Sequence, residues 1–160
     1  MAKALLSVIV VALLAVPASV FAQQSAAQQE VRQAIRDSYT YSVENLTDAP
    51  GVISSDGSLE FWSSGGLRQV VPSDAPLTEY ESFSLTPKHI RVTMLADDLV
   101  AVANFYAEGA FKERGQPAVT DYLTRATQVF VKEDGEWKVR SAHFSPITGG
   151  SGTSQRAVEN

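Results

Sequence analysis

The sequence contains no cysteine. This absence excludes a lipid anchor attached through a cysteine, a disulfide scaffold and a zinc site built on thiolates. An exported eukaryotic domain of this size would often carry disulfides. The composition therefore fits better a bacterial protein of the periplasm or the medium that folds on its hydrophobic core alone.

Positive charge is also scarce. The chain has 13 Lys and Arg against 18 Asp and Glu, a formal net charge of −5. Nucleic acids and anionic membranes bind to clustered basic residues, and the sequence has no such cluster. We therefore expect neither nucleic acid nor a membrane surface as a partner of the mature chain.

Motifs for cofactors and covalent catalysis are missing as well. The two histidines, His89 and His143, fall on different predicted strands, and no carboxylates stand near them at metal-ligand spacing. The glycine-rich run at 149–152 lacks the helix and lysine of a phosphate loop, and there is no Gly-x-Ser-x-Gly elbow. We expect no metal and no cofactor.

Only one long hydrophobic run is present, from Ala4 to Val16, preceded by Lys3. It is shorter than the roughly 20 residues that span a membrane. A proline follows it, and small residues end it at Ala22, which is the layout of a secretory signal peptide. We expect cleavage after Ala22 and a periplasmic or secreted mature protein.

The rest of the chain predicts one helix followed by a meander of strands. After a flexible lead at 23–29, apolar residues recur at three- and four-residue steps from Glu30 to Leu46, which indicates a helix that ends at Asp48-Ala49-Pro50-Gly51. A short aromatic strand is expected at 59–62, and a loop with a helical turn near 79–83 is expected within 70–85. Long strands are expected at 89–95, 99–111, 122–132 and 136–146. This is an α+β domain over 30–147, with a disordered tail at 148–160.

The last two strands form the most informative stretch, a hairpin with an acidic Asp134-Gly135 turn. Because side chains alternate along a strand, one face is expected to carry Trp137, Val139, Ser141, His143 and Ser145. A tryptophan in line with a histidine and hydroxyls predicts a half-apolar pocket with a polar floor. The expected core comprises Val31, Ile35, Phe61, Ile90, Val92, Val102, Phe105, Val129 and Val139.

Four stretches of the second half resemble the SnoaL-like branch of the nuclear-transport-factor-2-like (NTF2-like) superfamily. They are Tyr122-Leu123-Thr124-Arg125, Val129-Phe130-Val131-Lys132, Asp134-Gly135-Glu136-Trp137-Lys138-Val139 and His143-Phe144-Ser145-Pro146. The resemblance implies a cone, in which a curved antiparallel sheet wraps around the N-terminal helix and leaves a cavity. The superfamily includes isomerases, cyclases, dehydratases and association modules, so the fold does not decide the chemistry.

The sequence departs from related domains at two points. Many of them carry a histidine where this chain has Arg140, which is expected on the outer face or at a dimer surface. Isomerase-like relatives use a carboxylate in the cavity. Here the acidic residues cluster at turns, and Glu108 is the one expected in mid-strand beside Asn104 and Tyr106.

His143 is the candidate catalytic residue, because a neutral imidazole can donate or accept a proton near neutral pH. It is also a candidate ligand contact, together with Arg125, Tyr106, Asn104, Trp62 and Tyr41. The Arg125 guanidinium could clamp a carboxylate in the cavity, or it could pair with Glu108. Trp62 and Trp137 are expected to form apolar walls.

Three functions remain open. The first is an exported domain that binds a small, partly apolar and possibly anionic ligand in its cavity. The second is an isomerase or cyclase in which His143 moves a proton while Tyr106 or Arg125 stabilises an enolate. The third is a homodimeric association module without catalysis, in which the exposed sheet face forms the interface, with Arg140 and Phe144 in it. The resemblance implies a homodimer through that face, which we expect for this chain. The missing cavity carboxylate favours the first.

Overall fold

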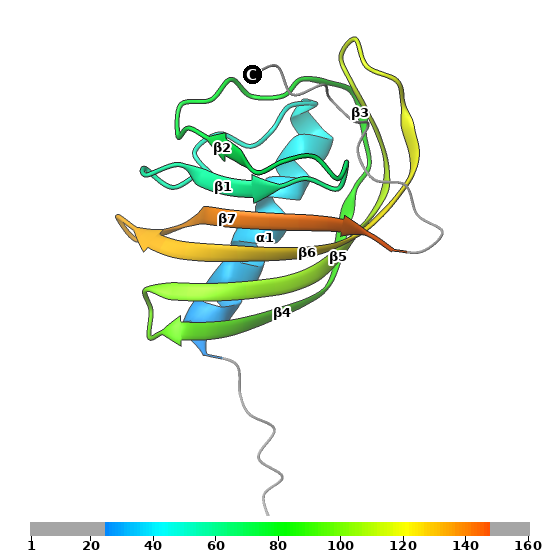
Figure 1. Cartoon of the computed structure of the whole chain (residues 1–160). Coiled ribbons are helices and arrows are strands. Elements are labelled where there is room, and N and C mark those ends of the chain that lie inside the picture. Colours follow the sequence, from blue (N-terminus) through cyan, green and yellow to red (C-terminus); the bar gives the residue numbers. More distant parts are fainter. Residues whose placement is uncertain (1–24, 148–160) are drawn as a thin grey trace, which may run out of the picture.

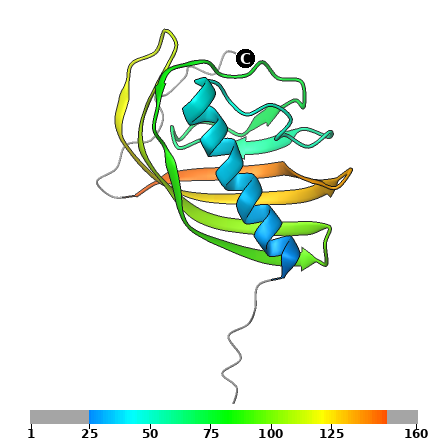
Figure 2. The same cartoon turned by 180° about the vertical axis from the view of Figure 1, so that it is seen from behind.

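The computed structural model describes residues 25–147, so the expected signal peptide and the expected tail at 148–160 lie outside the described residues. The described chain consists of one helix and a seven-stranded sheet. The helix crosses the concave face of the curved sheet (Figures 1 and 2), which confirms the predicted α+β cone. The elements are α1 (Ala26–Asn45), β1 (Ser58–Phe61), β2 (Gln69–Val71), β3 (Tyr80–Phe83), β4 (Thr86–Ala96), β5 (Val100–Glu113), β6 (Val119–Glu133) and β7 (Glu136–Pro146).

Helix α1 begins at Ala26, four residues before the expected start, so residues 26–29 are helical rather than a flexible lead. Ser25 caps the helix: its hydroxyl accepts a hydrogen bond from the Gln28 backbone N–H, and the Gln28 side chain accepts one from the Ser25 N–H. This reciprocal pair satisfies two donors that a helix start leaves unpaired. Val31 and Ile35 are buried against the sheet, as predicted.

The sheet has the order β2-β1-β7-β6-β5-β3, and β4 also pairs with β5. Strands β1 and β7 run parallel, so the sheet is mixed rather than wholly antiparallel as expected. The segment 70–85 contains strands β2 and β3, and the expected helical turn near 79–83 is the extended strand β3. This segment pairs with distant parts of the chain, which local sequence patterns do not reveal.

Strand β5 bends at Gly109, where it passes from pairing with β4 to pairing with β3. Gly109 has a φ of 139°, and a Cβ there would lie 2.4 Å from the Ser84 carbonyl oxygen. Only glycine tolerates both conditions. The bend turns the far ends of β5 and β6 around the end of the helix (Figure 1). Residues of both strands near the bend therefore line the space between the sheet and the helix.

Strand β7 contains a bulge that changes which residues face the helix. The register runs from Val129 opposite Ser141 to Phe130 opposite Val139, so Arg140 is an extra residue. Trp137 and Val139 face inward before the bulge, and Ala142 is buried after it. The expected alternation therefore breaks, and Ser141 and His143 lie on the outer face. A bulge of one residue exchanges the faces of everything beyond it.

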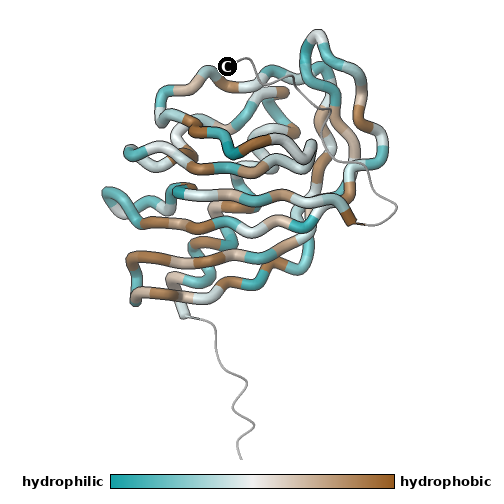
Figure 3. Tube along the Cα trace, viewed as in Figure 1, coloured by the Kyte–Doolittle hydropathy of each residue, from teal (hydrophilic) through white to brown (hydrophobic). Residues whose placement is uncertain are grey.

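The predicted core is confirmed except for three residues. Apolar and polar residues alternate along the long strands (Figure 3), and the inner set packs on α1. Phe61 is 47% exposed and lies on the outer face, since its neighbour Glu60 points inward. Val102 and Val129 are half-buried on the outer face, because their neighbours in the chain, Ala101 and Ala103 for Val102 and Gln128 and Phe130 for Val129, face inward.

Candidate ligand-binding cavity

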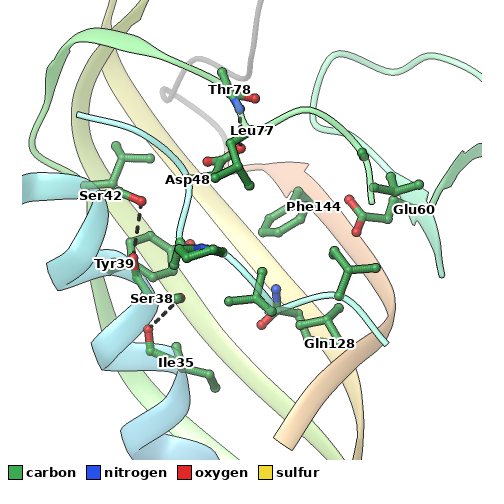
Figure 4. Close-up of a pocket in the computed structure, with 18 of the residues that line it drawn as sticks. Ile35, Ser38, Tyr39, Ser42, Asp48, Glu60, Leu77, Thr78, Gln128 and Phe144 are labelled. Carbon is green, nitrogen blue, oxygen red and sulfur yellow. Dashed lines mark hydrogen bonds between the residues drawn. The ribbon is translucent and has the colours of Figure 1, made fainter. Parts of the chain in front are cut away.

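A cavity of about 800 Å³ lies between α1, the inner face of the sheet and the segments at 48–53 and 62–80. This volume is in the range of small-molecule sites. Figure 4 shows Ser38, Tyr39 and Ser42 of the helix on one side and Glu60 on the other, with Phe144 between them. The cavity is thus formed where the bent sheet diverges from the C-terminal half of α1.

Glu60 is the buried ionisable residue of this cavity. It lies on β1, where alternation turns Ser58 and Glu60 inward and Phe61 outward. Only 4% of its surface is exposed. Burial raises the pKa of the Glu60 carboxyl above its ordinary value; hydrogen bonding by Ser58 partly offsets this rise, and the negative charge of Asp48 adds to it. Glu60 therefore holds a proton at a higher pH than a surface carboxyl does.

Asp48 is a second acid at the cavity, but its oxygens are already engaged. The Tyr80 hydroxyl donates to Oδ1 at 2.6 Å, and the Thr78 backbone N–H donates to Oδ2 at 3.2 Å. The Asp48 N–H in turn donates to the Thr78 carbonyl at 3.0 Å. Asp48 therefore ties the segment after the helix to the start of β3, and Glu60 is the acid available to a ligand.

Aromatic rings form part of the apolar wall. The Trp62 ring stacks on Phe144, with centroids 5.8 Å apart and planes inclined by 14°. Beside the helix, the ring of Tyr39 contacts those of Phe83 and Phe105. Among the described residues the Trp62 indole N–H is buried without a hydrogen-bond partner. An unpaired buried donor next to a cavity is satisfied when a ligand offers an acceptor.

Two buried tyrosines add hydroxyl groups to the lining. Burial raises the pKa of Tyr39 and of Tyr122, so both phenols stay protonated at physiological pH. Gln128 contributes an amide on β6 (Figure 4). The lining thus combines the buried Glu60 carboxyl, further acids such as Asp48, and neutral polar groups with aromatic and aliphatic side chains.

Five of the six predicted site residues do not reach this cavity, and four of these five lie on the outer face of the sheet. His143, Arg125, Asn104 and Tyr106 are exposed on the outer face of the sheet, away from α1. For His143 the reason is the β7 bulge. The other three follow the alternation set by buried Phe105 and Ala126. The expectation that imidazole and guanidinium converge inside the cone is therefore wrong.

Of the remaining predicted residues, only some lie where they were expected. Trp62 lines the cavity as expected, whereas Tyr41 on α1 does not. Glu108 pairs with Lys88 on the outer face rather than with Arg125. Arg140 donates to the Gly57 carbonyl at 3.1 Å, and Phe144 faces the cavity, so neither is presented as a free interface residue.

Sequence reasoning missed Glu60, Asp48 and Tyr39. The signal for Glu60 was present, because it stands two residues before Trp62, which was expected to form a wall. Two residues apart on a strand share a face. No cluster of three His, Cys, Asp or Glu that could hold a metal occurs within residues 25–147, and no helix in that range is long and apolar enough to cross a membrane.

Comparison with known families matches residues 34–149 to the model of the SnoaL-like domain. The chain belongs to the SnoaL-like family. This membership agrees with the cone and its cavity, and it confirms the resemblance seen in the sequence. Curated proteins offer no match.

Solved structures show the same fold at low identity. One is a Novosphingobium aromaticivorans protein named for a proposed aromatic ring hydroxylase activity, with 18% identity and a TM-score of 0.59, covering 78% of this chain and 92% of that one. Another, from the same organism, is named for a proposed scytalone dehydratase activity, with 13% identity and a TM-score of 0.57 over 81% and 87%. A third is a CamKII hub homology domain from Chlamydomonas reinhardtii, with 18% identity and a TM-score of 0.51 over 77% and 99%.

Proposed function

We propose that this SnoaL-like domain binds a small, partly apolar molecule in its cone cavity. The observation that carries the proposal is the buried Glu60 carboxyl in an aromatic cavity of about 800 Å³. Burying a carboxyl without full compensation is unfavourable, so such a group is kept where a ligand completes its hydrogen bonds. The ligand would present a hydroxyl or amine to Glu60 and an acceptor to the Trp62 N–H.

The lining argues against an anionic ligand. The expected clamp, Arg125, lies on the outer face, and the acids Glu60 and Asp48 line the cavity instead. The cation that also lines it, Lys138, is paired with Glu136. An anion there would meet like charge in a poorly solvated space. A neutral or cationic donor fits the same space better.

Calorimetric titration with matched naphthalene probes tests this. We expect 2-naphthol to bind and 2-naphthoate, which has the same ring and a negative charge, to bind at least about tenfold more weakly, the equivalent of about 1.4 kcal/mol. Glu60→Gln should weaken the naphthol complex, and Glu44→Gln, an exposed helix residue outside the cavity, should not. Equal binding of both probes, or an unchanged Glu60→Gln variant, would disprove the proposal.

A second candidate function is proton-transfer catalysis at the same residue. It is favoured by the raised pKa of Glu60, since a general acid or base works best with a pKa near the ambient pH. The protonated Tyr39 and Tyr122 hydroxyls could stabilise an enolate oxygen. In this version Glu60 replaces His143 as the residue that moves the proton.

Exchange of the α-protons of 2-tetralone in deuterium oxide, followed by NMR, separates the two functions. An enzyme should accelerate exchange, and Glu60→Gln should reduce the acceleration by about 10²- to 10⁴-fold. Binding of naphthol without any accelerated exchange would leave the domain a binding module.

Export stays a proposal that rests on the sequence before Gln23 alone. Expression of the full chain in a bacterial host, followed by mass spectrometry of the purified protein, should give an N-terminus at Gln23. A protein that keeps Met1 or Ala2 in such a host would argue against it.

A further inference from the structure

A second hollow lies on the outer face of the sheet, opposite the cone cavity. Its volume is about 410 Å³, and residues of β4, β5 and β6 line it, including His89, Arg91, Asn104, Tyr106, Arg125 and Thr127. All six of these side chains are exposed. Three of the ligand contacts predicted from the sequence, Arg125, Asn104 and Tyr106, therefore do come together, but here rather than inside the cone.

The register explains why the two arginines share this hollow. Arg91 on β4 is opposite Asn104 on β5, and Tyr106 on β5 is opposite Arg125 on β6. The Cα atoms of the two arginines thus lie on either side of β5, roughly 10 Å apart across the strands and roughly 7 Å apart along them. Long, flexible side chains from these positions can both reach a group bound over β5.

An irregularity in β4 adds a third donor. The register shifts between Lys88 and Arg91, and His89 has a φ of 55°. This bulge turns Lys88 and His89 both outward, while Ile90 is buried. The His89 ring meets the Tyr106 ring edge-on, with centroids 5.9 Å apart. Bulges often re-aim a side chain at a site in this way.

The charges in this hollow are not balanced by carboxylates. Arg91 makes no hydrogen bond or ion pair within residues 25–147, and Arg125 donates only to the Pro146 carbonyl, at 3.1 Å. None of the lining residues is acidic, and the nearby Glu108 is paired with Lys88. In a chain of net charge −5, two uncompensated guanidinium groups over one short stretch are a local excess of positive charge.

We propose that this outer hollow binds a small aromatic oxyanion, a carboxylate or a phosphate monoester. The guanidinium forks of Arg91 and Arg125 match the oxygens of either group. Asn104, which donates to Thr127 Oγ1 at 2.8 Å, keeps a second amide hydrogen for the anion. The edges of His89 and Tyr106 form a wall for the aromatic part.

A macromolecular partner fits the face less well. The overall negative charge repels nucleic acid. A second copy docked with its two-fold axis at this hollow would bring the same arginines toward one another, because residues close to such an axis meet their own copies. A small anion meets neither difficulty.

The test is titration of the ¹⁵N-labelled protein with phenyl phosphate, benzoate and benzyl alcohol, followed by amide chemical shifts. We expect either or both anions to move the amides of residues 88–92, 103–107 and 124–128 in a saturable manner, and the neutral alcohol not to move them. The anion that binds more tightly identifies the headgroup. Arg91→Gln with Arg125→Gln should weaken binding at least about tenfold, as expected for charge-assisted hydrogen bonds. Arg68→Gln, an exposed arginine outside the hollow, should leave it unchanged.

Three results would overturn the proposal. The first is that the anions change the amide chemical shifts around other arginines, such as Arg36 and Arg68, as much as those around the hollow. The second is unaltered affinity in the double variant. The third is a dimer, seen by sedimentation, in which the amides of the hollow are protected and do not respond to either anion. If the double variant does not keep a dispersed spectrum, the test uses Arg91→Lys instead, because lysine keeps the positive charge but lacks the two-pronged guanidinium. Weaker anion binding by Arg91→Lys supports the site. Equal binding refutes the contact between the Arg91 guanidinium and the anion.

Discussion

The ring of Trp62, just beyond β1, lies stacked on the ring of Phe144, on β7, with centroids 5.8 Å apart. The pair joins two strands that run parallel and that lie more than 80 residues apart in the chain. It forms the wall beside Glu60, and it exists only because the Arg140 bulge turns Phe144 inward and His143 outward.

The bulge can therefore be tested by comparing two neighbouring residues. Phe144→Ala should lower the free energy of unfolding by about 2 kcal/mol, below the roughly 3–5 kcal/mol of a fully buried phenylalanine, because Phe144 is half-buried. His143→Ala should change it by less than about 0.5 kcal/mol, as for other exposed residues. Urea unfolding measures both. A larger loss for His143→Ala would mean that the histidine faces the core.

Glu60 should make stability depend on pH. Its pKa in the folded protein is raised from the ordinary 4.5, so the protonated form is the better tolerated one. The native state should lose stability as the pH rises from the ordinary value through the raised one, by about 1.4 kcal/mol for each unit of difference. Glu60→Gln cannot ionise and should not show this loss.

The measurement is urea unfolding of both proteins between pH 4 and pH 8, taken as the difference between them. Other carboxyls titrate in both proteins and cancel in this difference. As the pH rises, the free energy of unfolding of Glu60→Gln should increase relative to that of the parent protein. A difference that stays constant over the whole range would show that Glu60 is solvated in the native state.

Gly109 should be a costly position to substitute. An alanine Cβ would lie 2.4 Å from the Ser84 carbonyl oxygen, at a φ of 139°. Gly109→Ala should destabilise the protein by about 2–4 kcal/mol, because the strained conformation and the backbone clash act together. Gly115→Ala is the control: its φ of 75° is also unfavourable, but nothing lies within 4 Å of the added Cβ. Equal costs at the two sites, read from thermal or urea unfolding, would show that the close approach at the bend is unimportant.

The N-terminal end of α1 is held to the sheet by a small charged cluster. Glu30 accepts from the Trp137 indole N–H at 3.0 Å and from Lys132 at 2.9 Å, and Lys132 also pairs with Asp98 at 2.8 Å. The hydrogen bonds from Lys132 and Trp137 lower the pKa of the Glu30 carboxyl below 4.5. Ionised Glu30 should therefore stabilise the native state at a pH above 4.5, and this stabilisation should be lost as the pH falls through the lowered pKa of the folded protein.

Glu30→Gln should accordingly lower the melting temperature at pH 7, and this loss should shrink as the pH falls below 4.5 and Glu30 takes up a proton in the folded protein. Glu44→Gln on the exposed side of the same helix controls for a change of helix charge. High salt should reduce the Glu30 effect, since the side chains are partly exposed. A loss that persists unchanged at pH 3 would indicate a packing role instead.

Much of the fold could be predicted from local patterns. The three- and four-residue spacing of Val31 and Ile35 identified the helix, and the Asp134-Gly135 pair identified the last hairpin, where both residues have positive φ values of 51° and 85°. Strand β7 begins and ends where it was expected. Short strands β2 and β3 were missed, because their hydrogen bonds go to residues far away in the sequence.

The candidate site was harder to predict, and Arg125 and Glu60 show why. Both are charged residues within strands, and a charged residue in a strand is normally on the exposed face. Arg125 follows this rule, and Glu60 violates it because the cone leaves space above β1 that apolar atoms do not fill. The one local signal that separates these outcomes is that Glu60 stands two residues before Trp62, which was expected to line the cavity.

By itself, the sequence determined the helix, the long strands, the hairpin turn and the family resemblance, because these depend on contacts between near neighbours and on periodic patterns. The tertiary structure decided which face each site residue occupies. A single extra residue at Arg140 exchanged inside and outside for His143, and the bend at Gly109 shaped the cavity around Glu60. Both depend on pairing between distant strands, whose register is set by the packing of the whole sheet.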